Sequence, residues 1–207
     1  MFICGLDEAG RGACIGDLIV AGAMIDSTKV GALKDLGVRD SKLLSPSRRE
    51  AIYQQLISMV GFRTVVFNPE EIDRYVSQHR LNTLEIEGMA TIINSLSPMH
   101  VIIDSPSTNR EEVKSEVVSR LENPGITVQV EYKADLNYLI VGAASIIAKV
   151  QRDNRIKALR QVYGDIGSGY PADPRAQKFL LDNRSRHLPI IRYSWKPVKN
   201  IAAAEAV

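Results

Sequence analysis

The chain has 207 residues, of which 45% are hydrophobic and 24% are charged, as is ordinary for a soluble globular protein with one α/β domain. Its formal net charge of +2 excludes an overall basic field, so any nucleic-acid site must be local. The two cysteines, Cys4 and Cys14, have no CxxC spacing, which argues against a disulfide scaffold or a zinc site.

Short apolar runs rich in β-branched residues predict the strands of a sheet. The runs are residues 2–6, 18–25, 62–67, 101–103 and 126–132. Two consecutive strands, followed by strands that alternate with helices, predict a mixed sheet with helices packed on it.

Helix start signals follow several of these runs. Pro46 comes after Ser45, Pro69 comes after Asn68, and Thr108 with Glu111 has the spacing of a capping box. The predicted helices are residues 46–60, 69–77, 81–96, 110–121, 136–163 and 175–183. Glycine and proline predict a loop over residues 167–174.

No segment predicts a membrane span or a secretory leader. Asp7 and Glu8 interrupt the N-terminal apolar run, and the longest later run, residues 139–148, is shorter than the ~20 residues that a bilayer requires. We therefore expect a cytoplasmic protein.

Acidic residues stand where predicted strands end. Asp7 and Glu8 follow the first run, Asp104 closes the fourth, and Asp135 follows the fifth. Strand ends can converge on one edge of a sheet, and converged carboxylates repel one another unless a divalent cation such as Mg²⁺ binds them. Taken alone, each acid has another interpretation, because Asp104 fits a turn before Ser-Pro, Asp135 fits a helix cap and Asp7-Glu8 fits a solvated turn.

The segment Gly10-Arg11-Gly12 follows the first acids directly. Its glycines let the backbone approach a ligand closely, and Arg11 offers planar donors that suit a phosphate. Gly10 and Gly12 also match the first half of a dinucleotide-binding fingerprint. Ile15 occupies the third glycine position, and a strand follows where that fingerprint needs a helix, so we disfavour this alternative.

Six motifs, in family order across most of the chain, resemble those of ribonuclease HII, the type 2 ribonuclease H, in its archaeal form. They are Gly5-Leu6-Asp7-Glu8-Ala9-Gly10-Arg11-Gly12, Asp40-Ser41-Lys42-Leu43-Leu44, Ile103-Asp104-Ser105-Pro106, Lys133-Ala134-Asp135, Ala144-Ser145-Ile146-Ile147-Ala148-Lys149-Val150-Gln151-Arg152-Asp153 and Gly167-Ser168-Gly169-Tyr170-Pro171-Ala172-Asp173. The resemblance implies a ribonuclease H-like mixed sheet flanked by helices. Residues 1–207 would form this one domain, with residues 165–207 as a helical and loop extension that helps to grip a duplex.

The resemblance also implies a reaction and its catalytic residues. Asp7, Glu8, Asp104 and Asp135 would hold two Mg²⁺ or Mn²⁺ ions about 3.5 to 4 Å apart, with Asp7 as the bridging ligand. The implied activity is that of an endoribonuclease. It would hydrolyse the RNA strand of RNA/DNA hybrids and cut 5′ of single ribonucleotides in duplex DNA, leaving a 5′-phosphate and a 3′-hydroxyl.

The same resemblance implies the substrate contacts. The Gly10-Arg11-Gly12 loop and Tyr170 would read a ribose 2′-hydroxyl in the minor groove. Lys42 resembles a phosphate contact, and Ser145 and Lys149, one helical turn apart, suit a grip on the DNA strand. Tyr170 alone also fits a packed loop anchor, and lysines often lie on solvated faces.

Two other functional classes remain as alternatives, a non-catalytic duplex-binding module and a nucleotidyl-transfer enzyme that acts on DNA. The four acids disfavour the binding module, because they would repel an anionic backbone. The Gly10-Arg11-Gly12 loop and Tyr170 disfavour the DNA enzyme. Ala176 stands where many relatives have threonine, and residues 201–207 lack the aromatic pair of a sliding-clamp docking peptide. We expect a monomer.

Overall fold

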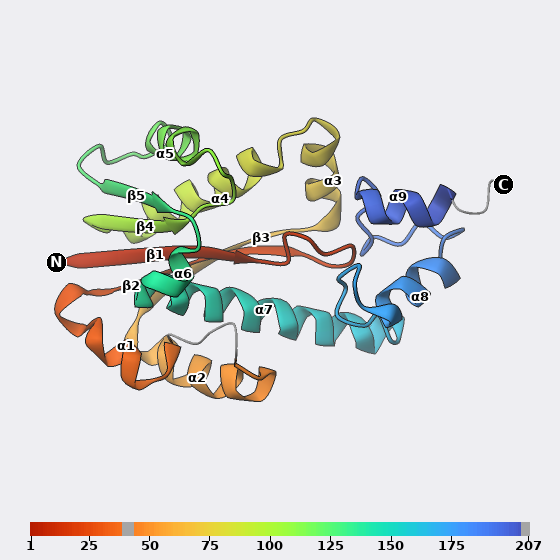
Figure 1. The fold of residues 1–207 in the computed structure, drawn as a ribbon, viewed down its shortest axis with the longest axis horizontal. Helices are drawn as coiled ribbons and strands as arrows, with labels where there is room; N and C mark the ends of the chain where they lie inside the picture. The colour runs from red at the N-terminus through yellow and green to blue at the C-terminus, as the bar shows by residue number, and fades with distance from the viewer. Residues whose placement is uncertain (39–43, 204–207) are drawn as a thin grey trace. The chain divides into compact units, whose positions relative to one another are not determined.

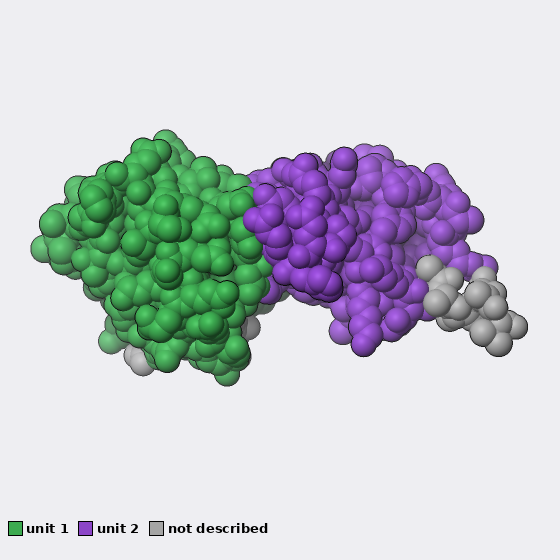
Figure 2. Space-filling model, turned by 90° about the horizontal axis from the view of Figure 1, so that it is seen from above, with its two compact units in different colours: residues 1–9, 20–65, 82–150 green, residues 10–19, 66–81, 151–207 purple. Residues whose placement is uncertain are grey.

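The computed structural model describes residues 1–38 and 44–203, so Lys42 and its motif neighbours Asp40, Ser41 and Leu43 lie outside the described residues. Two compact units make up the chain, and Figure 2 distinguishes them by colour. Unit 1 comprises Met1–Ala9, Val20–Val65 and Asn82–Val150, and unit 2 comprises Gly10–Ile19, Val66–Leu81 and Gln151–Val207. One domain with an extension from residue 165 stays a prediction.

A mixed sheet with the strand order β3-β2-β1-β4-β5 forms the centre of unit 1 in the described part of the chain. Its strands are β1 (Phe2–Ala9), β2 (Leu18–Asp26), β3 (Gly61–Phe67), β4 (His100–Asp104) and β5 (Thr127–Glu131). β4 is parallel to both β1 and β5, with Leu6 beside Ile103 and Asp104 beside Glu131. The carboxyl ends of β1, β4 and β5 therefore meet at one edge.

Helices cover both faces of this sheet in unit 1 (Figure 1). On one face lie α1 (Gly31–Asp35), α2 (Pro46–Met59) and the first half of α7 (Leu139–Tyr163), and on the other lie α4 (Leu81–Leu96) and α5 (Arg110–Val118). A 3-10 turn, η1 (Ser27–Lys29), precedes α1, and the short α6 (Ala134–Asn137) precedes α7. At Gly5 a Cβ would lie 2.4 Å from the Ile140 carbonyl carbon, so this close approach of α7 to β1 requires glycine.

Unit 2 has a hydrophobic core of its own. It contains α3 (Pro69–Ser77), the second half of α7, α8 (Pro174–Asp182) and α9 (Lys196–Ala203). Its buried residues include Cys14, Ile156, Ala176, Phe179 and Ile191. An antiparallel bridge joins Ile15 to Ile191 and ties the segment after the Gly10-Arg11-Gly12 loop to the C-terminal part of this unit.

The structure confirms the predicted mixed sheet, all five predicted strands and the exact bounds of α3 and α4. It corrects the single helix expected over residues 136–163, which is divided into α6 and α7 by the extended backbone of Tyr138. The Ala134 N–H donates to Asp104 Oδ1 at 3.0 Å. This bond fixes the start of α6 at the end of β4, separate from α7. Residues 134–139, where the break lies, contain no glycine or proline to signal it.

The capping box expected for Thr108 and Glu111 is also wrong by one residue. The N-cap of α5 is Asn109, whose Oδ1 accepts from the Glu112 N–H at 3.3 Å and whose Nδ2 donates to Glu112 Oε2 at 2.9 Å. Asparagine is a stronger N-cap than threonine, which explains the shift. Sequence analysis did not predict η1, α1 or α9. No helix in the described ranges is long and apolar enough to cross a membrane.

Candidate metal centre and nucleic-acid interface

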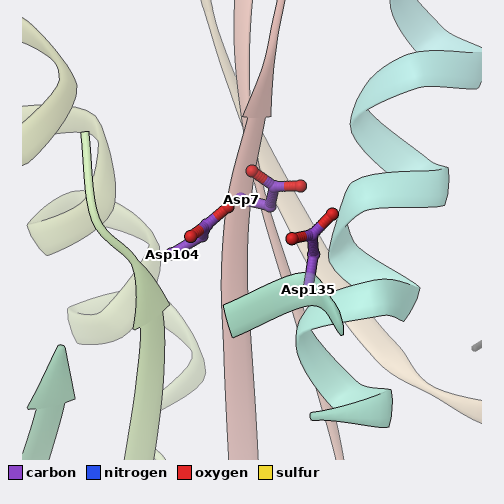
Figure 3. A group of neighbouring side chains, drawn as sticks. All are labelled: Asp7, Asp104 and Asp135. Carbon is purple, nitrogen blue, oxygen red and sulfur yellow. The ribbon is translucent and has the colours of Figure 1, made fainter. Parts of the chain in front are cut away.

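Three carboxylates from distant parts of the sequence converge in unit 1. Carboxylate oxygens of Asp7, Asp104 and Asp135 all lie within 4.8 Å of one another. Figure 3 shows the three side chains pointing toward one another from β1, β4 and α6. Asp7 and Asp135 are buried, and Asp104 is half-buried. The structure therefore brings together three of the four acids that the sequence singled out.

Strand register and one local turn produce this convergence. Asp7 and Asp104 each stand one residue beyond the registered pair Leu6 and Ile103 of two parallel strands, so they lie on neighbouring strands at one edge. Lys133 adopts the left-handed conformation, with φ of 56°, and starts the short helix that carries Asp135. The Asp104 carboxylate accepts from the Ala134 N–H, which fixes the start of that helix beside β4.

Glu8 does not join this cluster in the described structure. It follows Asp7 on the same strand, where successive side chains point to opposite faces. Its backbone N–H donates to Asp7 Oδ1 at 2.8 Å, so its backbone orients the neighbouring carboxylate. A metal-binding role for the Glu8 side chain stays a prediction.

Burial and charge act together on Asp7. Burial raises the pKa of its carboxyl to about 7. A hydrogen bond with the Ser145 side chain opposes that rise, the charge of Asp104 adds to it, and the charge of Lys149 and the Glu8 N–H oppose it further. Asp7 therefore binds a proton more tightly than an ordinary aspartate does.

Ser145 and Lys149 lie beside Asp7 rather than on an open helix face. Ser145 is fully buried, and its hydroxyl accepts from Lys149 Nζ at 2.7 Å, one turn along α7. Sequence reasoning assigned both residues to the DNA strand, which stays a prediction. Their contact with the acid cluster escaped that reasoning, because the pairing of α7 with β1 is a tertiary contact.

The donor set fits a hard divalent cation. All three groups are carboxylates, and oxygen ligands are those that Mg²⁺ and Mn²⁺ prefer. A bound dication would supply the positive charge that lets neighbouring buried carboxylates ionise together. The buried, raised-pKa Asp7 is thus the observation that favours a metal here over a solvated acidic turn.

Unit 2 holds the predicted substrate residues Gly10, Arg11, Gly12 and Tyr170. Tyr170 is 36% exposed, and its ring lies over the buried guanidinium of Arg152, 4.3 Å from the ring centroid to Cζ. The Gly169 carbonyl accepts from the Cys14 N–H at 2.8 Å and from the Ile15 N–H at 3.2 Å. The Tyr170 loop and the segment after Gly12 are therefore joined through the backbone.

Gly10 and Gly12 have different surroundings. Gly10 is buried with φ of 90°, and a Cβ there would lie 2.6 Å from the Asp17 carbonyl oxygen. Gly12 is exposed, and a Cβ there would meet nothing within 4 Å. The positive φ and the nearby Asp17 carbonyl therefore require glycine at position 10. The fold places no such requirement on position 12, which faces open space.

Arg192 organises this loop from inside and was missed by sequence analysis. It is fully buried, and it donates from Nε to the Gly16 carbonyl at 2.9 Å and from Nη1 to the Arg11 carbonyl at 3.1 Å. Burial, and next the charge of Arg152, lower its pKa to about 10. Its place directly after the apolar pair Ile190-Ile191 was the available signal, because a cation within an apolar run is often a buried, hydrogen-bonded one.

Comparisons with known proteins agree with this geometry. The sequence model described as Ribonuclease HII matches residues 4–198. A ribonuclease HII of Thermococcus sibiricus is 41% identical over 208 residues, covering 97% of this chain and 91% of that protein. The crystal structure of ribonuclease H2 from Pyrococcus horikoshii OT3 has a TM-score of 0.91 at 39% identity and covers 98% of both chains.

A chain in the structure of the PCNA:RNase HII complex from Archaeoglobus fulgidus has a TM-score of 0.88 at 37% identity, with 96% of each chain covered. These matches confirm the ribonuclease H-like fold. Together with the acid cluster, the match over nearly the whole sequence shows that this chain belongs to the ribonuclease HII family of metal-dependent endonucleases.

Proposed function

We propose that this protein hydrolyses the RNA strand of RNA/DNA hybrids and also cuts duplex DNA on the 5′ side of a single embedded ribonucleotide. The products would carry a 5′-phosphate and a 3′-hydroxyl. Family membership supports the ribonuclease H activity. The single observation that carries the proposal is the convergence of Asp7, Asp104 and Asp135 within 4.8 Å.

Asp7, Asp104 and Asp135 would hold the divalent ions, with Glu8 as a further ligand. We propose two ions, Mg²⁺ or Mn²⁺, and Asp7 as the ligand shared between them, since it has neighbours from the cluster and from α7. When bound, such ions supply an activated water and stabilise the leaving oxygen of a phosphodiester.

The chain's own residues orient this carboxylate set and partly offset the effect of burial on Asp7. Ser145 hydrogen-bonds with Asp7, and this bond and the charge of Lys149 both oppose the rise of the Asp7 pKa, so they favour the ionised form that a metal requires. The Ala134 N–H donates to Asp104 and fixes the direction of that carboxylate. These contacts support a preorganised centre with little left to rearrange when substrate arrives.

Recognition of the ribose would come from unit 2. The exposed Gly12 leaves room for a sugar edge, and the Tyr170 phenol is a donor beside an open surface. The ribose of RNA differs from the sugar of DNA in its 2′-hydroxyl, which both donates and accepts hydrogen bonds. A recognition site that needs only one such hydroxyl would let the enzyme act on a lone ribonucleotide. Lys42 would contact a substrate phosphate.

The test compares three labelled duplexes in Mg²⁺: an RNA/DNA hybrid, a DNA duplex with one ribonucleotide, and an all-DNA duplex. We expect cleavage of the first two only, with the single cut at the DNA–RNA junction and a 5′-phosphate on the downstream product. Tyr170→Phe should lower kcat/KM on the single-ribonucleotide duplex by roughly 5- to 150-fold, the equivalent of about 1 to 3 kcal/mol.

Tyr75→Phe on α3 is the matched control, because it removes the same atom from a half-buried tyrosine outside both loops. An intact single-ribonucleotide duplex beside a degraded hybrid would refute the junction activity. Cleavage of all-DNA would instead favour a general nuclease, and binding of the hybrid without turnover would favour a duplex-binding module.

A further inference from the structure

The backbone of the loop that carries Tyr170, residues 167–173, is held from two sides at Ser168. The Ser168 N–H donates to Asp173 Oδ2 at 2.7 Å, and the Ser168 carbonyl accepts from Arg152 Nη2 at 2.7 Å. A carboxylate and a guanidinium thus bind the N–H and the carbonyl of the same residue. Both are charge-assisted bonds, which are stronger than neutral ones.

Asp173 makes several bonds at once. Besides Ser168, its carboxylate accepts from the Arg175 N–H at 3.0 Å and pairs with Arg175 Nη2 at 3.0 Å, and it is the N-cap of α8. The Arg175 side chain, the Ser168 N–H and the Arg175 N–H hold the pKa of Asp173 well below its usual range. Its side chain is only 13% exposed.

The neighbouring positions of the loop are fixed as well. The Gly167 N–H donates to Asp165 Oδ1 at 3.0 Å, and the Gly167 carbonyl accepts from Arg160 Nε at 3.1 Å. The Asp173 N–H donates to the Tyr170 carbonyl at 3.1 Å. Asp173 therefore contacts Ser168 through its side chain and Tyr170 itself through its backbone.

These hydrogen bonds would fix the position of Tyr170, which must recognise a single hydroxyl group. A donor aimed at a single ligand atom has to be held within about 0.5 Å of its productive position. Tyr170 is exposed, and the backbone of the three residues before it is hydrogen-bonded, so its ring is held at the surface rather than buried. The side chain that closes this loop is distant from the acid cluster in sequence and is not one of its ligands.

We propose that Asp173 is a positioning residue for ribonucleotide recognition, which holds Tyr170 in its reading position by fixing Ser168 while it caps α8. This inference rests on the proposed function, in which Tyr170 reads the 2′-hydroxyl. It assigns Asp173 no contact with substrate.

The test separates the capping role of Asp173 from its loop contact. Asp173→Ser keeps a residue that caps helices well but leaves one oxygen in place of two, so it cannot serve both Arg175 and Ser168. We expect a thermal midpoint within about 2 °C of the parent. The kcat on the single-ribonucleotide duplex should fall about tenfold with little change in KM.

A double-mutant cycle with Tyr170→Phe supplies a readout that a merely structural role would not give. If Asp173 acts through the Tyr170 hydroxyl, Asp173→Ser should cost less than about twofold once that hydroxyl is absent. Amide exchange at Ser168 in the free protein should also become roughly tenfold faster in Asp173→Ser. Asp182→Ser is the matched control, because Asp182 is 56% exposed at the far end of α8 and pairs with Lys178.

The outcomes distinguish a failure of the proposed function from a failure of the positioning role of Asp173. If the parent leaves the single-ribonucleotide duplex whole, the proposed junction activity is wrong. If the parent cuts it and Tyr170→Phe cuts it equally well, the proposed reading of the 2′-hydroxyl by Tyr170 is wrong. The positioning role is refuted in both cases. If Tyr170→Phe is impaired but Asp173→Ser is not, only the positioning role is refuted. Full additivity of the two changes, or unchanged exchange at Ser168, would likewise overturn it.

Discussion

The guanidinium of Arg152 lies under the ring of Tyr170, with its central carbon 4.3 Å from the ring centroid. Arg152 is 4% exposed and also donates to the Ser168 carbonyl at 2.7 Å. A desolvated cation against an aromatic face contributes about 2 kcal/mol. The same positive charge draws electron density from the ring, which makes the phenol a stronger hydrogen-bond donor.

Replacement of this guanidinium should impair ribonucleotide reading. Arg152→Lys keeps the charge but loses the planar stack and the forked donors, so we expect kcat/KM on the single-ribonucleotide duplex to fall about tenfold. Arg74→Lys is the control, because Arg74 lies 5.7 Å from the Tyr75 ring on the surface of α3. Parent-like kinetics of Arg152→Lys would show that the stacked geometry is dispensable.

Neutralisation of the clustered acids should abolish cleavage without unfolding the protein. Asp7→Asn and Asp104→Asn each remove a proposed metal ligand, and we expect at least ~100-fold lower kcat in Mg²⁺ with hybrid affinity equal to or above that of the parent. Affinity should not fall, because less negative charge faces the nucleic-acid backbone. Asp35→Asn on α1 is the control. Turnover near the parent rate in either cluster variant would refute the metal assignment.

The raised pKa of Asp7 predicts a pH dependence of stability in the metal-free protein. Its folded pKa of about 7 exceeds the model-peptide value of 3.8, so the folded state binds the proton more tightly than the unfolded state does. The stability that this proton provides is fully present below about pH 4 and is lost as pH rises through about 7. We therefore expect the free energy of unfolding to decline over this window less in Asp7→Asn than in the parent.

Added Mg²⁺ should reverse this loss. The ion binds the ionised carboxylates, so the rise in thermal midpoint on adding Mg²⁺ should be larger at pH 8 than at pH 5.5. Denaturant titrations without metal, and thermal melts with Mg²⁺ or a chelator, measure the two effects on the parent and on Asp7→Asn. An equal Mg²⁺ shift at the two pH values would contradict this linkage.

The two glycines of the arginine loop should respond differently to alanine. Gly10→Ala should lower the thermal midpoint, because φ is 90° and the Cβ would lie 2.6 Å from the Asp17 carbonyl oxygen. Gly12→Ala should keep or slightly raise stability, by up to about 1 kcal/mol, because its Cβ meets open space. Its cleavage rate should nevertheless fall if a sugar edge occupies that space. Parent-like cleavage by a stable Gly12→Ala would show that no substrate atom approaches this position.

Calcium should support binding but little cleavage. Ca²⁺ forms longer bonds and a looser coordination shell than Mg²⁺, which would spoil the spacing that two-metal hydrolysis needs. Hybrid binding and single-turnover cleavage, each measured in Ca²⁺ and in Mg²⁺, check this expectation. Brisk turnover in Ca²⁺ alone would count against the proposed arrangement.

Local sequence signals were sufficient for most of the secondary structure and for the identity of the acids. Proline at the first helical position and the Asn68 cap define α3, and the period of apolar residues defines α4, so both helices match their predicted bounds. Asp7, Asp104 and Asp135 were visible because each follows an apolar run. These signals act over a few residues, and a single sequence contains them.

The tertiary structure alone decided which of these residues meet. The parallel register of β1 and β4 joins Asp7 to Asp104, while α6 brings Asp135 to them through a bond between Ala134 and Asp104. Strand alternation leaves Glu8 out of the cluster, although it is adjacent to Asp7 in the sequence. Contacts of this kind join segments distant in the sequence, 30 residues apart for Ala134 and Asp104 and more for Asp7 and Asp104, and that pairing is set by the packing of the whole core rather than by local propensity.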